Sequence, residues 1–170
     1  MGEAEVSWPD RGRWSAVVDR TLAIEWPQQA APVYAGVRMR RALTLEGSAL
    51  DDEFEVAAGA ERTIDWLIHV RGAFEGSTDP APQALAGPCG YDQLTEIRSV
   101  TESGPLRFAL PSGRLTIALE VEPGERLYLA SAPGNPAADR HLLLVRRRRA
   151  AHTRFRARFT LSSAASPRVR

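Results

Sequence analysis

The chain has 170 residues, 44% of them hydrophobic, which suffices for one domain with a substantial core and is too short for two. Its formal net charge of +1 argues against a general polyanion-binding tail, although all 22 basic residues are arginines. We attribute the arginine bias to codon usage, but it has a chemical consequence, because the planar guanidinium pairs with carboxylates in a way that lysine does not.

The single cysteine, Cys89, excludes an internal disulfide and a metal cluster built on cysteines. No apolar run is long enough to span a bilayer, and residues 1–8 lack the apolar core of a signal peptide. We therefore predict no membrane segment, no signal peptide and no membrane partner.

Alternating, β-branched or aromatic runs follow one another along the chain, separated by turn sequences rich in glycine and proline. We predict strands at 14–19, 21–26, 37–45, 49–56, 63–71, 94–101, 106–110, 114–121, 126–131, 141–148 and 153–161. No stretch keeps a helical period over three turns. The expected fold is all-β, an antiparallel two-sheet β-sandwich of about ten to eleven strands.

The organisation along the chain is that of one domain over residues 13–161, with flexible ends at 1–12 and 162–170. Residues 75–90 form the one long loop between predicted strands. Loops of that length in compact domains are often functional or mobile.

Two neighbouring predicted strands carry charged residues that could form a site. Because alternate side chains of a strand share a face, Ile64 and Trp66 lie on one face, and Asp65 and His69 on the other. Asp52 is in register with apolar neighbours and so points toward the core. Asp52, Asp65 and His69 could supply three ligands for zinc or a similar ion.

An ion pair is the structural alternative for the same carboxylate. Arg41 also falls in register with apolar residues, so we expect Arg41 to pair with Asp52, with Asp65 in the same ion-pair cluster. Spacing alone favours this structural interpretation over a metal site.

A second candidate site lies near the C-terminus, where arginines alternate with apolar residues. Arg154, Arg156 and Arg158 share one outward face, and we expect Arg146 on the preceding strand to lie beside them. Such a surface could bind the carboxylates or sulfates of an acidic polymer. The alternative is that acidic residues of a neighbouring strand neutralise it, with Glu120, Glu122, Glu3 and Glu5 as candidates. Nucleic acid is a poorer fit, since no aromatic residue lies on the arginine face.

Several segments together resemble the C-terminal β-sandwich of heparinase II/III-like polysaccharide lyases. They are VYAGVRMRRAL (33–43), LDDEFEV (50–56), DWLIH (65–69), GYDQL (90–94), LLVRR (143–147) and the strand that ends in FTL (159–161). The resemblance covers about residues 14–161, and it depends on the order and spacing of these segments.

The resemblance implies a domain that packs against a helical toroid and covers an acidic, uronic-acid polysaccharide. The toroid carries the tyrosine and histidines that transfer protons in the β-elimination reaction. Several members of the family bind a structural zinc through histidine, aspartate and histidine. By resemblance, His69 is the last of these ligands, and Asp52 or Asp51 the middle one.

The sequence departs from the family pattern in two respects. Residues 34–41 contain no histidine where the first zinc ligand is expected, and Arg38 or Arg41 could occupy that space. No helical toroid can be built from this chain, so we expect it to be inactive on its own, with no catalytic residues. The expected partners are an acidic polysaccharide and a toroid domain or chain; the alternative is a stand-alone carbohydrate-binding or structural domain.

Overall fold

The computed structural model describes residues 4–7, 13–21, 36–87, 90–134, 136 and 139–163. Its strands are β1 (Ala4–Ser7), β2 (Arg13–Thr21), β3 (Val37–Glu46), β4 (Ala49–Val70), β5 (Ala73–Phe74), β6 (Thr95–Ser99), β7 (Leu106–Leu110), β8 (Gly113–Glu120), β9 (Arg126–Pro133) and β10 (Arg140–Ser163). One 3-10 turn, Tyr91–Gln93, precedes β6. The described part of the chain contains no helix that is long and apolar enough to cross a membrane.

All strand pairs are antiparallel, in agreement with the predicted all-β class. The prediction of two separate sheets is not confirmed, because the ten described strands form one hydrogen-bonded network. The order is β1-β2-β3-β4-β10-β8-β7-β5, and β9 and β6 continue from the other half of β10. The predicted strand at 21–26 lies almost wholly outside the described residues.

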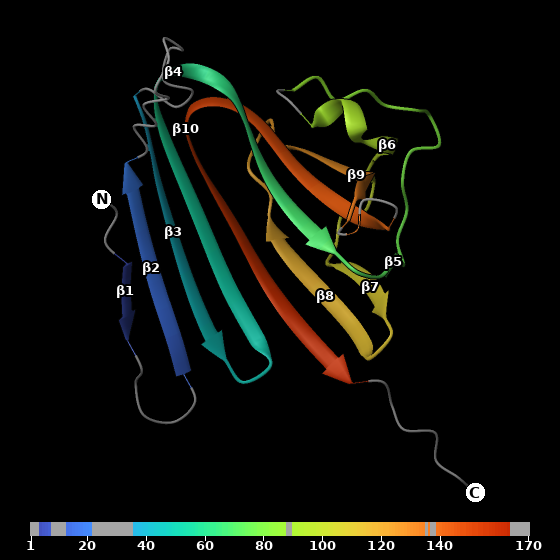
Figure 1. Cartoon of the computed structure of the whole chain (residues 1–170), viewed down its shortest axis with the longest axis horizontal. Helices are drawn as coiled ribbons and strands as arrows, with labels where there is room; N and C mark the ends of the chain where they lie inside the picture. The colour runs from blue at the N-terminus through green and yellow to red at the C-terminus, as the bar shows by residue number, and fades with distance from the viewer. Residues whose placement is uncertain are drawn as a thin grey trace, which may run out of the picture.

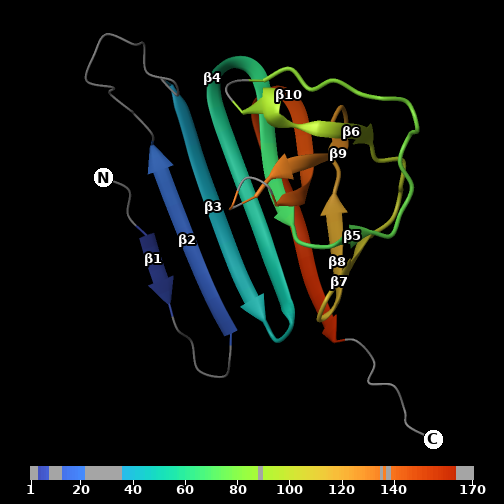
Figure 2. The same ribbon diagram turned by 45° about the vertical axis from the view of Figure 1, so that its right-hand side comes forward.

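The two long strands explain how one sheet encloses a core. Both β4 and β10 run to one end of the molecule, turn over and run back (Figures 1 and 2). The rings of Phe54 and Trp66, which belong to the same strand, therefore lie only 6.3 Å apart. The sequence predicts two strands with a turn between them in each case, at 49–56 and 63–71 and at 141–148 and 153–161, where the structure has one continuous strand.

The turn of the sheet coincides with a register shift between β4 and β10. Ala150 pairs with Arg62, whereas His152 pairs with Ala57, so residues 58–61 face only one residue of β10. Such bulges bend a strand and increase its twist. β4 advances five residues here and β10 only two, so the register slips by an odd number of residues. The slip exchanges the two faces of β10, which decides where its arginines point.

The main core lies between the two halves of the folded sheet. Phe108, Ile117, Leu144 and Phe155 are completely buried there, and each apolar side chain of this size contributes about 1.5–3 kcal/mol on burial. The predicted alternation in residues 63–71 is confirmed, since Ile64, Trp66 and Val70 are buried and Leu67 is exposed.

A smaller cluster lies on the opposite face of β10, beneath the segment 75–90. Leu85 of this segment packs with Tyr128, Leu143 and Val145. The segment is also tied to β6 by the hydrogen bonds Asp79 N–Ser99 O (2.9 Å) and Gln83 N–Ile97 O (3.0 Å).

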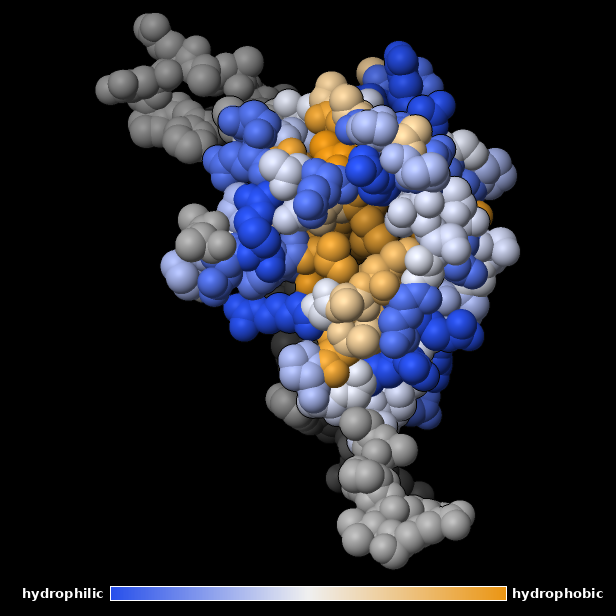
Figure 3. All heavy atoms as spheres, turned by 90° about the vertical axis from the view of Figure 1, so that its right-hand side faces the viewer, coloured by the Kyte–Doolittle hydropathy of each residue, from blue (hydrophilic) through white to orange (hydrophobic). Residues whose placement is uncertain are grey.

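Viewed from the side where β5 and β7 lie in Figure 1, hydrophobic side chains line a hollow with hydrophilic borders (Figure 3).

Candidate functional site

Asp52 and Arg41, expected to form an ion pair, are joined by two hydrogen bonds. Arg41 donates from Nε to Asp52 Oδ1 (3.0 Å) and from Nη2 to Oδ2 (2.6 Å). The Asp52 side chain is 2% exposed and that of Arg41 is 49% exposed. The buried carboxylate is therefore paired with a guanidinium that remains in contact with solvent. The hydrogen bond with Asp52 raises the pKa of Arg41, which keeps the guanidinium charged.

Asp52 and His69, predicted as metal ligands on neighbouring strands, are not brought together. Both belong to β4, and their partners on β10 are Ala157 and Leu143, on opposite sides of the bend. Asp52 points into the core, whereas His69 lies on the exposed outer face. The described residues contain no group of three or more histidine, cysteine, aspartate or glutamate side chains that could hold a metal ion. These residues therefore do not fit the zinc site that the resemblance implies.

Asp65 belongs to a different cluster from the one predicted. Arg147 donates to both of its carboxylate oxygens (2.7 Å each), and the hydroxyl of Tyr91 donates to Oδ2. Burial, followed by the bond to Asp65, raises the pKa of Tyr91 to about 12. The hydrogen bond with Asp65 also raises the pKa of Arg147. The sequence held no local signal for this cluster, because Asp65 and Arg147 are 82 residues apart.

The Asp65–Arg147–Tyr91 cluster fastens the loop above it. Arg147 also donates to the carbonyl of Ala86 (2.8 Å), and its guanidinium lies 5.6 Å from the centre of the Tyr91 ring. Gly87 packs so closely on the Tyr91 ring that a Cβ atom there would clash. The cluster therefore fixes residues 86 and 87 of this segment against the sheet.

Arg154, Arg156 and Arg158 share the outer face of β10, but each is matched by an acidic residue of β4. In the register of the two strands they pair with Glu55, Glu53 and Asp51, respectively. Arg158 donates to Asp51 (2.8 and 3.1 Å), and Arg156 to Glu53 (2.8 Å). Arg154 lies 3.4 Å from Glu55 and 3.7 Å from Glu53. The neutralising alternative is thus present, mostly through residues that sequence reasoning did not name.

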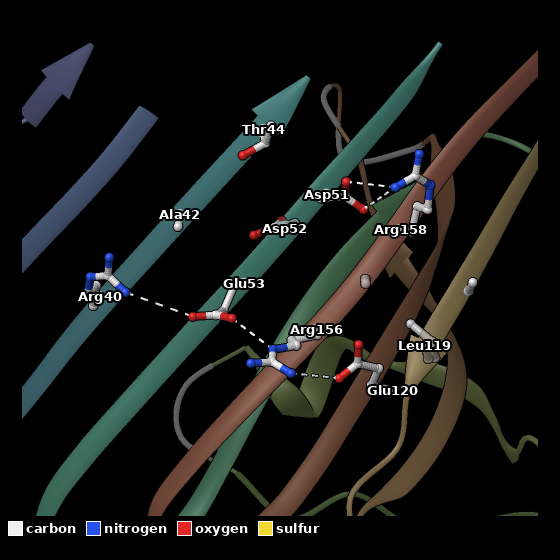
Figure 4. A pocket seen from close by; sticks show the side chains of 12 residues that line it. Arg40, Ala42, Thr44, Asp51, Asp52, Glu53, Leu119, Glu120, Arg156 and Arg158 are labelled. Carbon is white, nitrogen blue, oxygen red and sulfur yellow. Dashed lines mark hydrogen bonds and ion pairs between the residues drawn. The ribbon is translucent and has the colours of Figure 1, made fainter. Parts of the chain in front are cut away.

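The charged row continues onto the strands on either side (Figure 4). Arg40 of β3 lies 3.9 Å from Glu53, and Arg156 also contacts Glu120 of β8 at 3.0 Å. Together these side chains cross four neighbouring strands in alternating sign. We call this set the charge ladder: Arg40, Asp51, Glu53, Glu55, Glu120, Arg154, Arg156 and Arg158.

Small side chains leave a groove along the ladder. Ala42 and Thr44 of β3 and Ala118 of β8 line it together with ladder residues, and its volume is ≈ 630 Å³. Arg156 and Arg158, which line the groove, keep 43% and 51% of their side chains exposed. The groove, which we call the ladder groove, is therefore open to solvent and offers both cationic donors and anionic acceptors.

Arg146, predicted to lie beside these arginines, is instead completely buried. Its guanidinium packs against the rings of both Trp66 and Phe155, 5.2 Å from each centre. It donates to Glu125 (2.5 and 3.1 Å), whose side chain is also 0% exposed, and to the carbonyl of Glu120 (2.6 Å). The register shift explains the error, since even-numbered residues of β10 point inward before the bulge and outward after it.

No protein-family model matches the chain, and no curated protein does. Among solved structures, the fold resembles part of the heparan sulfate lyase HepC of Pedobacter heparinus, with a TM-score of 0.55 and 7% sequence identity. It also resembles the Slr1438 protein of Synechocystis sp. PCC 6803, with a TM-score of 0.52 and 11% identity. Each match covers 96% of this chain, which spans 22% of the HepC chain and 66% of the Slr1438 chain. At these identities the likeness establishes the fold alone: an antiparallel β-domain of the kind found as one part of a heparan sulfate lyase.

Proposed function

We propose that the chain is a non-catalytic β-domain of the polysaccharide-lyase type, which contacts or covers an acidic glycan. The observation that carries this proposal is the structural match to HepC over 96% of the chain and only 22% of the lyase. A domain of that relative size fits the role of an accessory layer beside a catalytic domain, supplied by the same chain or by another.

The ladder groove is the surface that we assign to the glycan. Arg156 and Arg158 are about half exposed, and their ion pairs with acidic residues hold the guanidinium groups in place. Exposed ion pairs contribute only about 0–1 kcal/mol each, so a ligand carboxylate or sulfate can compete for these donors. Because the ladder is balanced in charge, we expect weak binding that falls with salt.

The geometry of Tyr91 argues against proton abstraction by this residue. A tyrosine that removes a proton near neutral pH needs a lowered pKa. Tyr91 instead has a pKa raised to about 12, and its hydroxyl is held by Asp65. Tyr91 therefore serves to hold the loop. We expect no β-elimination by this chain alone, because it spans only 22% of the HepC chain.

A purely structural or interaction domain is the second candidate. The one-to-one matching of Arg154, Arg156 and Arg158 with acidic residues of β4 supports it. In that case the ladder stabilises the sheet and needs no ligand.

Two measurements test the proposal. Affinity electrophoresis with heparan sulfate, heparin, alginate and chondroitin sulfate reports binding, and the ultraviolet absorbance of unsaturated uronate reports lyase action. We expect retardation of the wild-type chain that falls strongly in the triple variant Arg154→Gln/Arg156→Gln/Arg158→Gln, with no absorbance change. The matched control is Arg62→Gln/Arg107→Gln/Arg126→Gln, which removes the same charge from exposed positions outside the ladder. Absence of retardation with every acidic glycan would favour the structural candidate.

A further inference from the structure

A second opening lies at the bend of β10, next to the ladder groove. On the side away from β4, β10 pairs with β9 as far as Arg147 and with β8 from Arg156 onward. Residues 148–155 therefore have no strand partner on that side among the described residues. A hollow of ≈ 300 Å³ lies there, which we call the corner pocket; its lining residues are Glu122, Arg148, His152, Thr153, Arg154 and Arg156.

The lining of the corner pocket differs in charge from that of the ladder groove. Three guanidinium groups, an imidazole and a hydroxyl line the pocket, with Glu122 as its one acidic lining residue. The ladder groove is lined by three arginines and four acidic residues. Of the two openings, the corner pocket thus has the surplus of positive lining groups.

The acidic partners of these arginines are arranged so that an anion can enter. Glu53 and Glu55 hold Arg154, Arg156 and His152 from β4, and neither lines the pocket. Glu122 contacts Arg148 at 3.2 Å, and its side chain is 46% exposed. An exposed pair of this kind is weak enough for a ligand to displace.

One buried donor among the pocket residues has no hydrogen-bond partner. The Nε atom of Arg154 is buried and makes no hydrogen bond, since the Glu53 carboxylate is 3.7 Å away. Buried donors are almost always satisfied, so an unsatisfied one needs an explanation. An oxyanion that reaches this group would supply the missing acceptor.

We propose that the corner pocket is an oxyanion subsite that takes a sulfate or carboxylate group of an acidic glycan. Arg156 lines both openings, so a chain lying along the ladder groove would bring one anionic substituent to Arg148 and Arg154. The identity of the ligand as a glycan rests on the function proposed above, whereas oxyanion binding at these residues does not.

Nitrogen–proton NMR of the arginine Nε–H groups tests the subsite with sodium sulfate as the probe. We expect saturable shifts of the Arg148 and Arg154 resonances with sulfate that do not occur with sodium chloride at equal ionic strength. Identical responses to the two salts would overturn the proposal. A second titration compares a sulfated heparin tetrasaccharide with its desulfated form, which retains carboxylates, and so separates the two anion classes.

Variants expected to weaken and to strengthen sulfate binding are compared, because misfolding could only weaken it. Arg148→Gln/Arg154→Gln should abolish the saturable sulfate response, and Arg107→Gln/Arg126→Gln should not change it. Glu122→Gln removes the competing carboxylate and should tighten sulfate binding about fivefold, the equivalent of one exposed ion pair. A loss of affinity in Glu122→Gln would contradict the proposal.

The two proposals fail in different ways. Sulfate binding without retention on any glycan would leave the subsite standing and end the glycan function. Glycan retention that is unchanged in Arg148→Gln/Arg154→Gln would leave the glycan function standing and end the subsite.

Discussion

Arg146 and Arg156 belong to the same strand, but they have opposite environments. Arg146 is completely buried against two aromatic rings, with the buried Glu125 as its partner. Arg156 is 43% exposed and lies between Glu53 and Glu120 on the open face. The same type of side chain is thus part of the core before the bend, at Arg146, and part of a solvent-accessible surface after it, at Arg156. Both arginines are paired with acidic residues, so solvent exposure, more than pairing, decides how much each contributes to the free energy of unfolding.

The largest effect should come from the buried pair. In Arg146→Met the carboxylate of Glu125 loses its partner while it remains buried, which costs about 3–5 kcal/mol. The double variant Arg146→Met/Glu125→Gln should recover much of this loss, because the uncompensated charge is gone. Urea unfolding measures both free energies. A loss below about 1 kcal/mol in the single variant would show that the pair is not desolvated as described.

The cluster that holds the loop should show a smaller effect with a distinct pH dependence. Tyr91→Phe removes the hydrogen bond to Asp65, which should cost about 0.5–1.5 kcal/mol. The pKa of Tyr91 rises from 10.0 to about 12 in the folded chain. Its contribution is therefore present below pH 10 and is lost as the pH rises toward 12.

Unfolding measured between pH 8 and pH 12 tests this window, since the wild type should lose more stability than Tyr91→Phe above about pH 10. Hydrogen exchange should also become faster in residues 75–87 of the variant. Parallel pH profiles for the two proteins would exclude a role of Tyr91 in this dependence.

A single ion pair of the charge ladder should contribute little to the free energy of unfolding. Arg158→Gln breaks the pair with Asp51, in which both side chains are about half exposed, so we expect a loss below about 1 kcal/mol. The loss should shrink as salt is raised, because exposed charges are screened. Urea unfolding at low and high salt measures it. A larger loss that does not depend on salt would show that the Arg158–Asp51 pair is desolvated like the Arg146–Glu125 pair, and would contradict this prediction.

The smallest effect concerns acid stability at the bend. The hydrogen bond from His152 is the largest cause that lowers the pKa of Glu55 below 4.5, and Arg154 adds to it. The contribution of Glu55 is therefore present above pH 4.5 and is lost as the pH falls through the lowered value. In His152→Gln the acid unfolding midpoint should move slightly to higher pH, whereas His69→Gln is the matched control. An unchanged midpoint in His152→Gln would remove His152 from the acid response.

Much of the local structure could be predicted from the residue pattern. The alternation of Ile64, Trp66 and Val70 with Asp65 and Leu67 indicated a strand with one buried face, and that face is buried. Asp52 could be placed inward by the same reasoning. Such predictions succeed because the two faces of a strand are determined by neighbouring residues alone.

The position of Arg146 could not be predicted, because it depends on a register shift some residues away. Between Ala150 and His152 the pairing with β4 slips, and the inward face of β10 changes from even-numbered to odd-numbered residues. The residues around Gly59 have the composition of a turn, so the sequence indicated a chain reversal rather than a bend within one strand. For the same reason Asp52 and His69 were expected on neighbouring strands.

The sequence by itself determined the all-β class, the alternation within each strand and the inward position of Asp52, because these follow from the side-chain period of two. Only the tertiary structure decided that one sheet folds over itself, that Arg146 is in the core, and that Asp65 meets Arg147 and Tyr91. Those outcomes depend on pairing between segments far apart in the chain, and a slip in register at one point moves every later side chain of a strand to its other face.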